Sequence, residues 1–203
     1  DSIYNGADDD ASGTAAVLMI AEAMAKRARP ARSVAFVLFS AEERGLRGSE
    51  AFANRPPLPL GAVVANCNIE MIGRPEPGHE RKVWITGREL SDFAAIAEPA
   101  LRRGGCELID FALAADLFAG SDNLSLARKG VVAHSISAGS LIEEKRLHDD
   151  YHRPSDEVGK LDIAHMTAVI GALLEVVVEF ADRQERPRYS EKGLEYVKSL
   201  DRR

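Results

Sequence analysis

The chain has 203 residues with 26 Lys and Arg against 32 Asp and Glu, which gives a formal net charge of -6. This length predicts one main domain, and a hydrophobic share of 45% is enough for a packed core. The acidity argues against nucleic acid or an anionic membrane surface as a partner, because both require a basic patch. The two cysteines, Cys67 and Cys106, are too few for a disulfide-stapled scaffold, and they either pair or stay free.

Helical and strand patterns alternate along the chain. Residues 13–27 are predicted to form a helix because apolar residues recur at helical spacing, with Ser12 as its N-cap. Residues 33–40 (SVAFVLFS) form an unbroken apolar run, which predicts a strand buried on both faces. Three more strands are predicted at 61–69, 82–86 and 131–137, and two more helices at 91–103 and 161–182. This alternation predicts an α/β layered fold with helices on both faces of the sheet.

The C-terminal third contains two segments of contrasting character. The apolar stretch 163–180 is interrupted by His165, Glu175 and Glu179, which predicts a buried helix rather than a membrane span. Residues 183–203 are charged and polar, and their pattern fits either a surface helix or a frayed tail. We therefore divide the chain into a main domain, 1–182, and a C-terminal segment, 183–203.

Four acidic or histidine-bearing segments stand at the ends of predicted elements, where open α/β sheets place their sites. They are 5–13 (NGADDDASG), 40–45 (SAEERG), 68–73 (NIEMIG) and 149–157 (DDYHRPSDE). Each has an ordinary structural explanation when taken alone. Asp8 to Asp10 fit a helix cap, Glu42 and Glu43 fit a solvated turn, and His152 fits an exposed loop position.

Together these segments favour a metal site. Carboxylates that converge at one edge of a sheet repel one another unless a cation lies among them. Oxygen and imidazole ligands without thiolates are typical of a catalytic zinc or a similar divalent ion. The adjacent Glu42 and Glu43 then allow one carboxylate to bind metal while the other acts as general base towards water.

In their order and spacing, these segments resemble the M28 family of zinc-dependent aminopeptidases over roughly residues 5–162. The resemblance implies a three-layer α/β/α sandwich with a mixed, mostly parallel central sheet, with 1–182 as the peptidase domain. It also implies a centre with two zinc ions. Asp9 resembles the carboxylate that bridges them, and its peptide bond to Asp10 corresponds to a characteristic cis bond. Glu43 and His152 resemble ligands of the first zinc, and Glu42 resembles the general base.

The resemblance departs from the family pattern at some positions. Glu70 stands where the family usually has Asp as a ligand of the second zinc. Tyr151 is similar to a tyrosine that stabilises the oxyanion in some members. Residues 121–123 (SDN) look like an S-D-H/Y segment near the substrate pocket. Residues 112–120 either line that pocket or serve as core or lid.

The upstream H-x-D motif that supplies a histidine to the second zinc is absent. The five histidines are His79, His134, His148, His152 and His165, and none precedes Asp9. The resemblance therefore implies a chain that lacks the N-terminal part of the catalytic domain. The first site, Asp9, Glu43 and His152, is complete, whereas the second keeps only Asp9 and Glu70 and is predicted to be empty or weak.

The resulting functional prediction is a zinc-dependent metallo-aminopeptidase acting on peptides with a free N-terminus, without a nucleic-acid or membrane partner. Secretion or a periplasmic location follows from the resemblance alone. A sheet edge exposed by missing strands would allow the chain to form an oligomer. Two alternatives stay open: a single-zinc enzyme similar to glutaminyl cyclases, and an inactive fragment or binding module.

Overall fold

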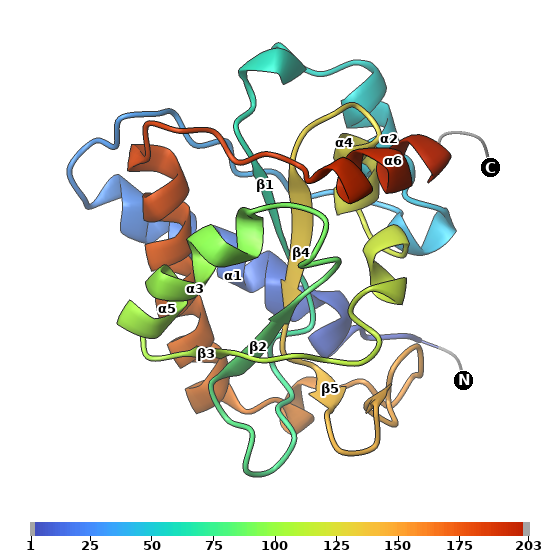
Figure 1. Ribbon diagram of the computed structural model, residues 1–203. Helices are drawn as coiled ribbons and strands as arrows, with labels where there is room; N and C mark the ends of the chain where they lie inside the picture. Colours follow the sequence, from blue (N-terminus) through green and yellow to red (C-terminus); the bar gives the residue numbers. More distant parts are fainter. Residues whose placement is uncertain (1–2, 201–203) are drawn as a thin grey trace.

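The computed structural model, which describes residues 3–200, places a mixed sheet between two groups of helices (Figure 1). The strand order is β1-β4-β2-β3, with β1 parallel to β4, β4 antiparallel to β2, and β2 parallel to β3. These strands are β1 Asn66–Ile69, β2 Lys82–Ile85, β3 Glu107–Leu108 and β4 Ala133–Ser137. A separate antiparallel pair consists of β5 Ser140–Leu141 and β6 Arg146–Leu147. The predicted α/β class with a mixed, largely parallel sheet is confirmed.

The helices form the outer layers. Helices α1, α3 and α5 pack together on one face of the sheet, and α2, α4 and α6 lie on the other (Figure 1). Their bounds are α1 Gly13–Ala25, α2 Arg47–Asn54, α3 Phe93–Arg103, α4 Asn123–Ala127, α5 Ile163–Asp182 and α6 Glu191–Leu200. Short helical turns are found at Leu60–Ala62, Asp116–Ala119 and Val158–Lys160, among others.

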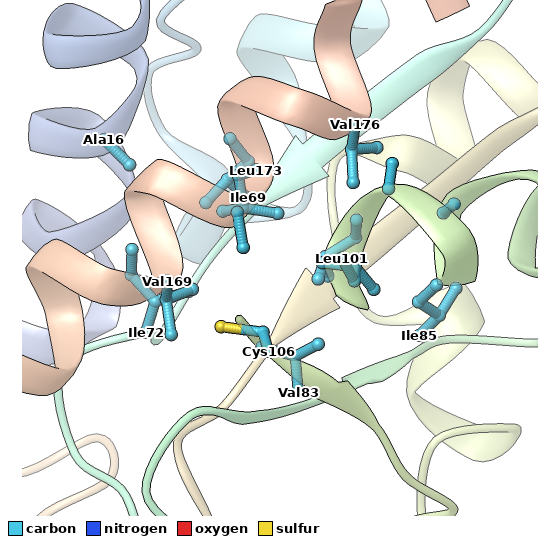
Figure 2. Close-up of a cluster of buried hydrophobic side chains, with 14 of the residues drawn as sticks. Ala16, Ile69, Ile72, Val83, Ile85, Leu101, Cys106, Val169, Leu173 and Val176 are labelled. Carbon is cyan, nitrogen blue, oxygen red and sulfur yellow. The ribbon is translucent and has the colours of Figure 1, made fainter. Parts of the chain in front are cut away.

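The main core lies between the sheet and the layer of α1, α3 and α5 (Figure 2). Alternate strand residues, Val83 and Ile85 of β2 and Ile136 of β4, are fully buried there. Leu101 from α3 meets them from the helical side. Cys106 packs in the same cluster, and the two cysteines are both free rather than paired.

A second cluster covers the opposite face of the sheet, where Phe118 and Leu124 pack. Helix α6 lies over this cluster and buries Val197 and Leu200 in it. The charged C-terminal segment thus contains a surface helix with an apolar inner face. The last three residues of the predicted segment, 201–203, lie outside the described residues.

Helix α5 is, among the residues described, the one helix long and apolar enough to cross a membrane by length and composition. In this fold its buried face contacts α1 and α3, and 44% of its most apolar stretch is buried. Val169, Leu173 and Val176 are fully enclosed in the main core. The apolar character of α5 is thus used for packing in the folded domain.

Most predicted elements form where the pattern placed them. The helices expected at 13–27, 91–103 and 161–182 correspond to α1, α3 and α5, and the strands at 82–86 and 131–137 to β2 and β4. The strand expected at 61–69 begins only at Asn66, because Leu60–Ala62 forms a helical turn.

The strand predicted at 33–40 was wrong. The segment has no regular secondary structure and is not part of the sheet, and within residues 3–200 the backbone groups of 33–39 have no backbone hydrogen bonds. Phe36 is 39% and Leu38 50% exposed, so the run is not covered on both faces. A strand forms only when a neighbouring strand accepts its hydrogen bonds, and this condition is invisible to local apolar patterning.

Ser12 stands at the N-cap position of α1 as predicted, but its side chain does not cap the helix. The Ser12 hydroxyl donates to the Asp8 carbonyl over 2.7 Å and accepts from the Ile72 N–H over 3.0 Å. Asp10 caps the helix instead, since its Oδ1 accepts the Gly13 N–H at 3.1 Å. Ser12 therefore joins the start of α1 to the segment after β1.

Candidate metal centre and cleft

The candidate site residues come from four segments that meet at one end of the sheet. Glu70 follows β1 directly, and Glu42 lies in the turn Glu42–Arg44. Asp9 is in the turn that leads into α1, and His152 is in the loop between β6 and α5. All four line the same cleft. The fold thus brings together the segments that the sequence analysis singled out.

Asp9, His152 and Glu43, the neighbour of Glu42, are close enough together to hold one metal ion. His152 Nε2 lies 3.2 Å from Asp9 Oδ2 and 3.2 Å from Glu43 Oε1. One potential ligand atom from each residue lies within 4.8 Å of the other two. An imidazole and two carboxylates without a thiolate form the three-ligand set of a catalytic zinc, which keeps a further position for water or substrate. The donor set therefore fits zinc.

The cleft itself has an acidic wall and an apolar wall, enclosing about 270 Å³. The acidic wall consists of Asp9, Glu42, Glu43 and Glu70, together with Tyr151 and His152. The apolar wall is provided by Leu46, Met71, Trp84, Leu117 and Leu147. A site with catalytic polar groups beside an apolar surface can bind a small molecule or chain end that has a charged group and an apolar side chain.

Glu70 lies outside the three-residue cluster and has different partners. Its carboxylate accepts a 2.6 Å hydrogen bond from Ser121 Oγ. Asn68 Nδ2 donates to both Ser121 Oγ and Ser135 Oγ, at 2.9 and 3.0 Å. Burial raises the pKa of Glu70 to about 7, and the Ser121 hydrogen bond opposes that rise. Glu70 is therefore a half-buried carboxylate held by a hydrogen-bond network.

Glu42 and Asp9, two further carboxylates of the cleft, also have raised pKa values. Desolvation, followed by the charge of Glu43, raises the pKa of Glu42 to about 8. The same two causes raise the pKa of Asp9 to about 6, while the His152 charge opposes them. Acidic groups that destabilise one another's charged forms in this way are stabilised by a cation placed among them.

Tyr151 adjoins the three-residue cluster as a hydrogen-bond donor. Its ring stacks on that of His152, with centroids 3.8 Å apart. Burial and the negative charges of Asp9 and Glu43 raise the pKa of its phenol, so the hydroxyl stays protonated at neutral pH. Tyr151 lines the cleft and can donate to a negatively charged oxygen there.

Three site segments contain non-glycine residues with left-handed backbone conformations. His152 has φ 55°, and Ala41 and Met71, each next to a cleft carboxylate, have φ 57° and 50°. Such conformations are costly and tend to persist at functional sites, where the surrounding structure holds them. The Asp9–Asp10 peptide bond is cis, as the resemblance implied.

The segments 121–123 and 112–120, which were candidates for the substrate pocket, each have some residues in the cleft and others in the core. In the segment 121–123, Ser121 lines the cleft, whereas Asn123 is fully buried and accepts a hydrogen bond from Ser135. In 112–120, Leu117 lines the cleft and Phe118 is fully buried, so this stretch contributes to both lining and core.

Sequence reasoning missed the residues that support the site through backbone contacts. Asp10 Oδ1 accepts the N–H groups of Gly13 and Met71, both at 3.1 Å, and so joins α1 to the segment after Glu70. Asp156 accepts N–H groups from the turn that carries Asp9. The only available signal was that Asp156 is an acidic residue close to His152, which does not distinguish it from a surface carboxylate.

Comparison with known proteins supports the resemblance drawn from the motifs. The chain is 30% identical over 186 residues to Leucine aminopeptidase 1 of Ajellomyces capsulatus, covering 87% of this chain and 47% of that protein. A solved structure described as BSAP, a zinc aminopeptidase from Bacillus subtilis, matches 92% of this chain and 45% of its own with a TM-score of 0.74 and 20% identity. Porphyromonas gingivalis glutaminyl cyclase matches 90% of this chain and 64% of its own, with a TM-score of 0.61 and 19% identity.

The chain spans less than half the length of the curated relatives that it matches, including 19% of Leupeptin-inactivating enzyme 1 of Streptomyces exfoliatus. The solved structures, at 19–20% identity, share its fold. The model of Peptidase family M28 matches residues 1–180, nearly the whole chain. The cleft, its acidic wall and the four motif segments all lie within that match. The chain therefore belongs to peptidase family M28.

Proposed function

We propose that this chain binds zinc through Asp9, Glu43 and His152 and hydrolyses the N-terminal peptide bond of peptides. The single observation that carries the proposal is the approach of His152 Nε2 to within 3.2 Å of both carboxylates, beside a cleft that also contains Glu42. The names of the relatives support the same activity, since they are aminopeptidases, and the Bacillus structure is described as a zinc enzyme.

In the proposed mechanism, zinc when bound would supply a Lewis acid that lowers the pKa of water and polarises a carbonyl group. Glu42 receives a proton from the attacking water and passes it to the leaving amine, because it lines the cleft without belonging to the three-residue cluster. The raised pKa of Glu42, about 8, places its protonation equilibrium near neutral pH, where the group can both take up and release a proton. Tyr151 donates its hydroxyl proton in a hydrogen bond to the oxyanion.

The free amino group of the substrate is proposed to bind at the Glu70 side of the acidic wall. Glu70 is a carboxylate in the cleft that is not needed by the three-residue cluster. Its position next to the cluster would allow a second ion to bind between Asp9 and Glu70. With only these two ligands among the described residues, we expect a second ion to bind weakly.

The proposal is tested by the Glu42→Gln variant. We expect about a 10²–10⁴-fold loss of turnover of aminoacyl-nitroanilides, because the proton acceptor is removed. Zinc content, measured by atomic absorption, stays at the wild-type level because Glu42 is not a ligand. Glu50→Gln, an exposed residue of α2, is the matched control and keeps full activity. Activity that survives Glu42→Gln contradicts the assignment of the base.

A second candidate function is glutaminyl cyclisation, favoured by the presence of one three-ligand cluster among residues 3–200 and by the fold shared with the Porphyromonas enzyme. A peptide with N-terminal glutamine distinguishes the two functions: a peptidase releases free glutamine, whereas a cyclase releases ammonia and leaves a cyclised peptide. Stabilisation by zinc without turnover of either substrate would instead indicate a binding module.

A further inference from the structure

Asp156 joins the two segments that carry Asp9 and His152. The N–H of Asp8 lies 3.0 Å from each carboxylate oxygen of Asp156, and the N–H of Asp9 lies 3.0 Å from Oδ2. The N–H of Ala7 donates to the backbone carbonyl of Asp156 over 3.2 Å. Three consecutive N–H groups of the turn before α1 therefore all end on this one residue.

Asp156 is 2% exposed, and within residues 3–200 its carboxylate has no ion-pair partner. A buried carboxylate is stabilised when N–H groups converge on it, and such charge-assisted hydrogen bonds are stronger than neutral ones. An amide side chain has the same shape but one acceptor oxygen, and its NH₂ group cannot accept an N–H. The site therefore specifically requires a carboxylate at position 156.

The loop between Asp156 and His152 is short and closed by turns. The N–H of Asp156 donates to the Arg153 carbonyl over 3.1 Å, and the N–H of Arg153 to the Asp150 carbonyl over 3.0 Å. A shift of Asp156 relative to Asp9 is therefore transmitted to His152, which lies within these turns. The contact between Asp156 and the Asp9 backbone thus helps to set the distance between Asp9 and His152.

Asp8, which is fully buried, makes a second connection between the turn that contains Asp9 and the loop that contains His152. Asp8 Oδ2 lies 3.0 Å from His148 Nε2, at the start of the same loop. Asp8 Oδ1 accepts the Gly73 N–H at 2.7 Å, from the segment that also contains Glu70. The turn that contains Asp9 is thus bonded to the His152 loop and to the segment of Glu70. Of these bonds, the one to Asp156 is made by Asp9 itself.

We propose that Asp156 is a positioning residue for the candidate metal site. Its carboxylate fixes the Asp9 backbone against the His152 loop and so sets the geometry and affinity of the three-ligand cluster. This inference rests on the proposed function only in that Asp9, Glu43 and His152 bind a metal ion. Residues that hydrogen-bond to metal-ligating side chains typically affect metal affinity by about 10–100-fold when they are replaced. We expect an effect of the same order from Asp156, which acts through the backbone of a ligand.

The test compares Asp156→Asn with Asp162→Asn, using Co²⁺ as a spectroscopic probe. Asp162 is the N-cap of α5, where its Oδ1 accepts the His165 N–H at 2.9 Å, so it makes the same kind of carboxylate-to-backbone bond away from the cleft. Affinity and ligand field are read from the Co²⁺ absorption band, and the melting temperature of the metal-free protein reports on folding. We expect Asp156→Asn to weaken Co²⁺ binding about 10–100-fold and to shift the band, whereas Asp162→Asn changes only the melting temperature.

Wild-type Co²⁺ affinity and an unchanged band in Asp156→Asn would overturn the inference, because Asp156 would then only support the fold. If Asp156→Asn does not fold, Asp156→Glu carries the same comparison, since it keeps the charge and moves the carboxylate by one methylene. A wild-type chain that does not bind Co²⁺ at all would contradict the proposed metal site itself. The two failures are thus distinguishable.

Discussion

Ser121 Oγ donates a 2.6 Å hydrogen bond to the carboxylate of Glu70, which is thereby held on a network of buried serine and asparagine side chains. The arrangement separates two kinds of carboxylate in one cleft. Asp9 and Glu43 approach an imidazole nitrogen, whereas Glu70 has neutral hydroxyl donors. The different partners account for the different chemistry proposed for the two groups.

Replacing Ser121 by Ala is expected to destabilise the metal-free protein by about 1–3 kcal/mol at pH 8.5, because a buried charged acceptor loses its donor. The Ser121 hydrogen bond opposes the rise of the Glu70 pKa, which stands at about 7. Below that pH Glu70 is protonated, and the loss should be smaller. Urea denaturation at pH 5 and pH 8.5 measures the difference. Ser140→Ala removes a neutral hydrogen bond to Trp84 Nε1 and should show no such pH dependence.

Replacing His152 by Ala is expected to abolish tight zinc binding, because the cluster loses its nitrogen ligand and keeps two carboxylates of like charge. We expect one tightly bound zinc per wild-type chain and a rise in its dissociation constant of at least about 100-fold in the variant. Competition with a chromophoric chelator measures both. His79→Ala, next to Glu76 but away from the cleft, should bind zinc normally. Two tightly held ions in the wild type would contradict the assignment of a weak second site.

The metal-free protein should lose stability as the pH rises from about 4 to about 8. The pKa values of Asp9, Glu70 and Glu42 are raised to about 6, 7 and 8, so the folded state binds more protons than the unfolded state over this range. Their contribution to stability is fully present below the unfolded values and is lost as the pH passes the folded ones. Bound zinc opposes the repulsion, so the increase in melting temperature on adding zinc should grow with pH. An increase that is constant from pH 5 to pH 8 would contradict this origin.

The apolar wall of the cleft predicts a preference for substrates with a large apolar N-terminal residue, such as Leu, over those with Asp or Glu. Leu117→Ala should lower kcat/KM for the leucyl substrate by about 10-fold, since a few buried methylene groups are worth about 1–3 kcal/mol in such a pocket. Leu113 packs in the same apolar cluster without lining the cleft, so Leu113→Ala is the matched control. Equal losses in both variants would indicate general destabilisation instead of substrate contact.

The sequence by itself determined the elements that depend on local pattern, and it supplied the candidate residues for the chemistry. Apolar spacing located α1, α3 and α5, and the SAEERG and DDYHRPSDE segments identified Glu42, Glu43, Tyr151 and His152 as candidates. The helix predictions are confirmed, because helical periodicity is visible without knowledge of the neighbours. The roles of the four site candidates stay a prediction that depends on the order and spacing of their motifs.

Only the tertiary structure decided which of these side chains meet. It brought Asp9, Glu43 and His152 together and placed Glu70 against Ser121, which is 51 residues away in the chain. It also showed that residues 33–40 do not pair as a strand, because pairing depends on a partner that a local pattern cannot specify. The contact of Asp156 with the Asp9 backbone, across 147 residues, belongs to the same class. Such long-range contacts depend on packing and on hydrogen bonds between distant residues, and both exist only in the folded chain.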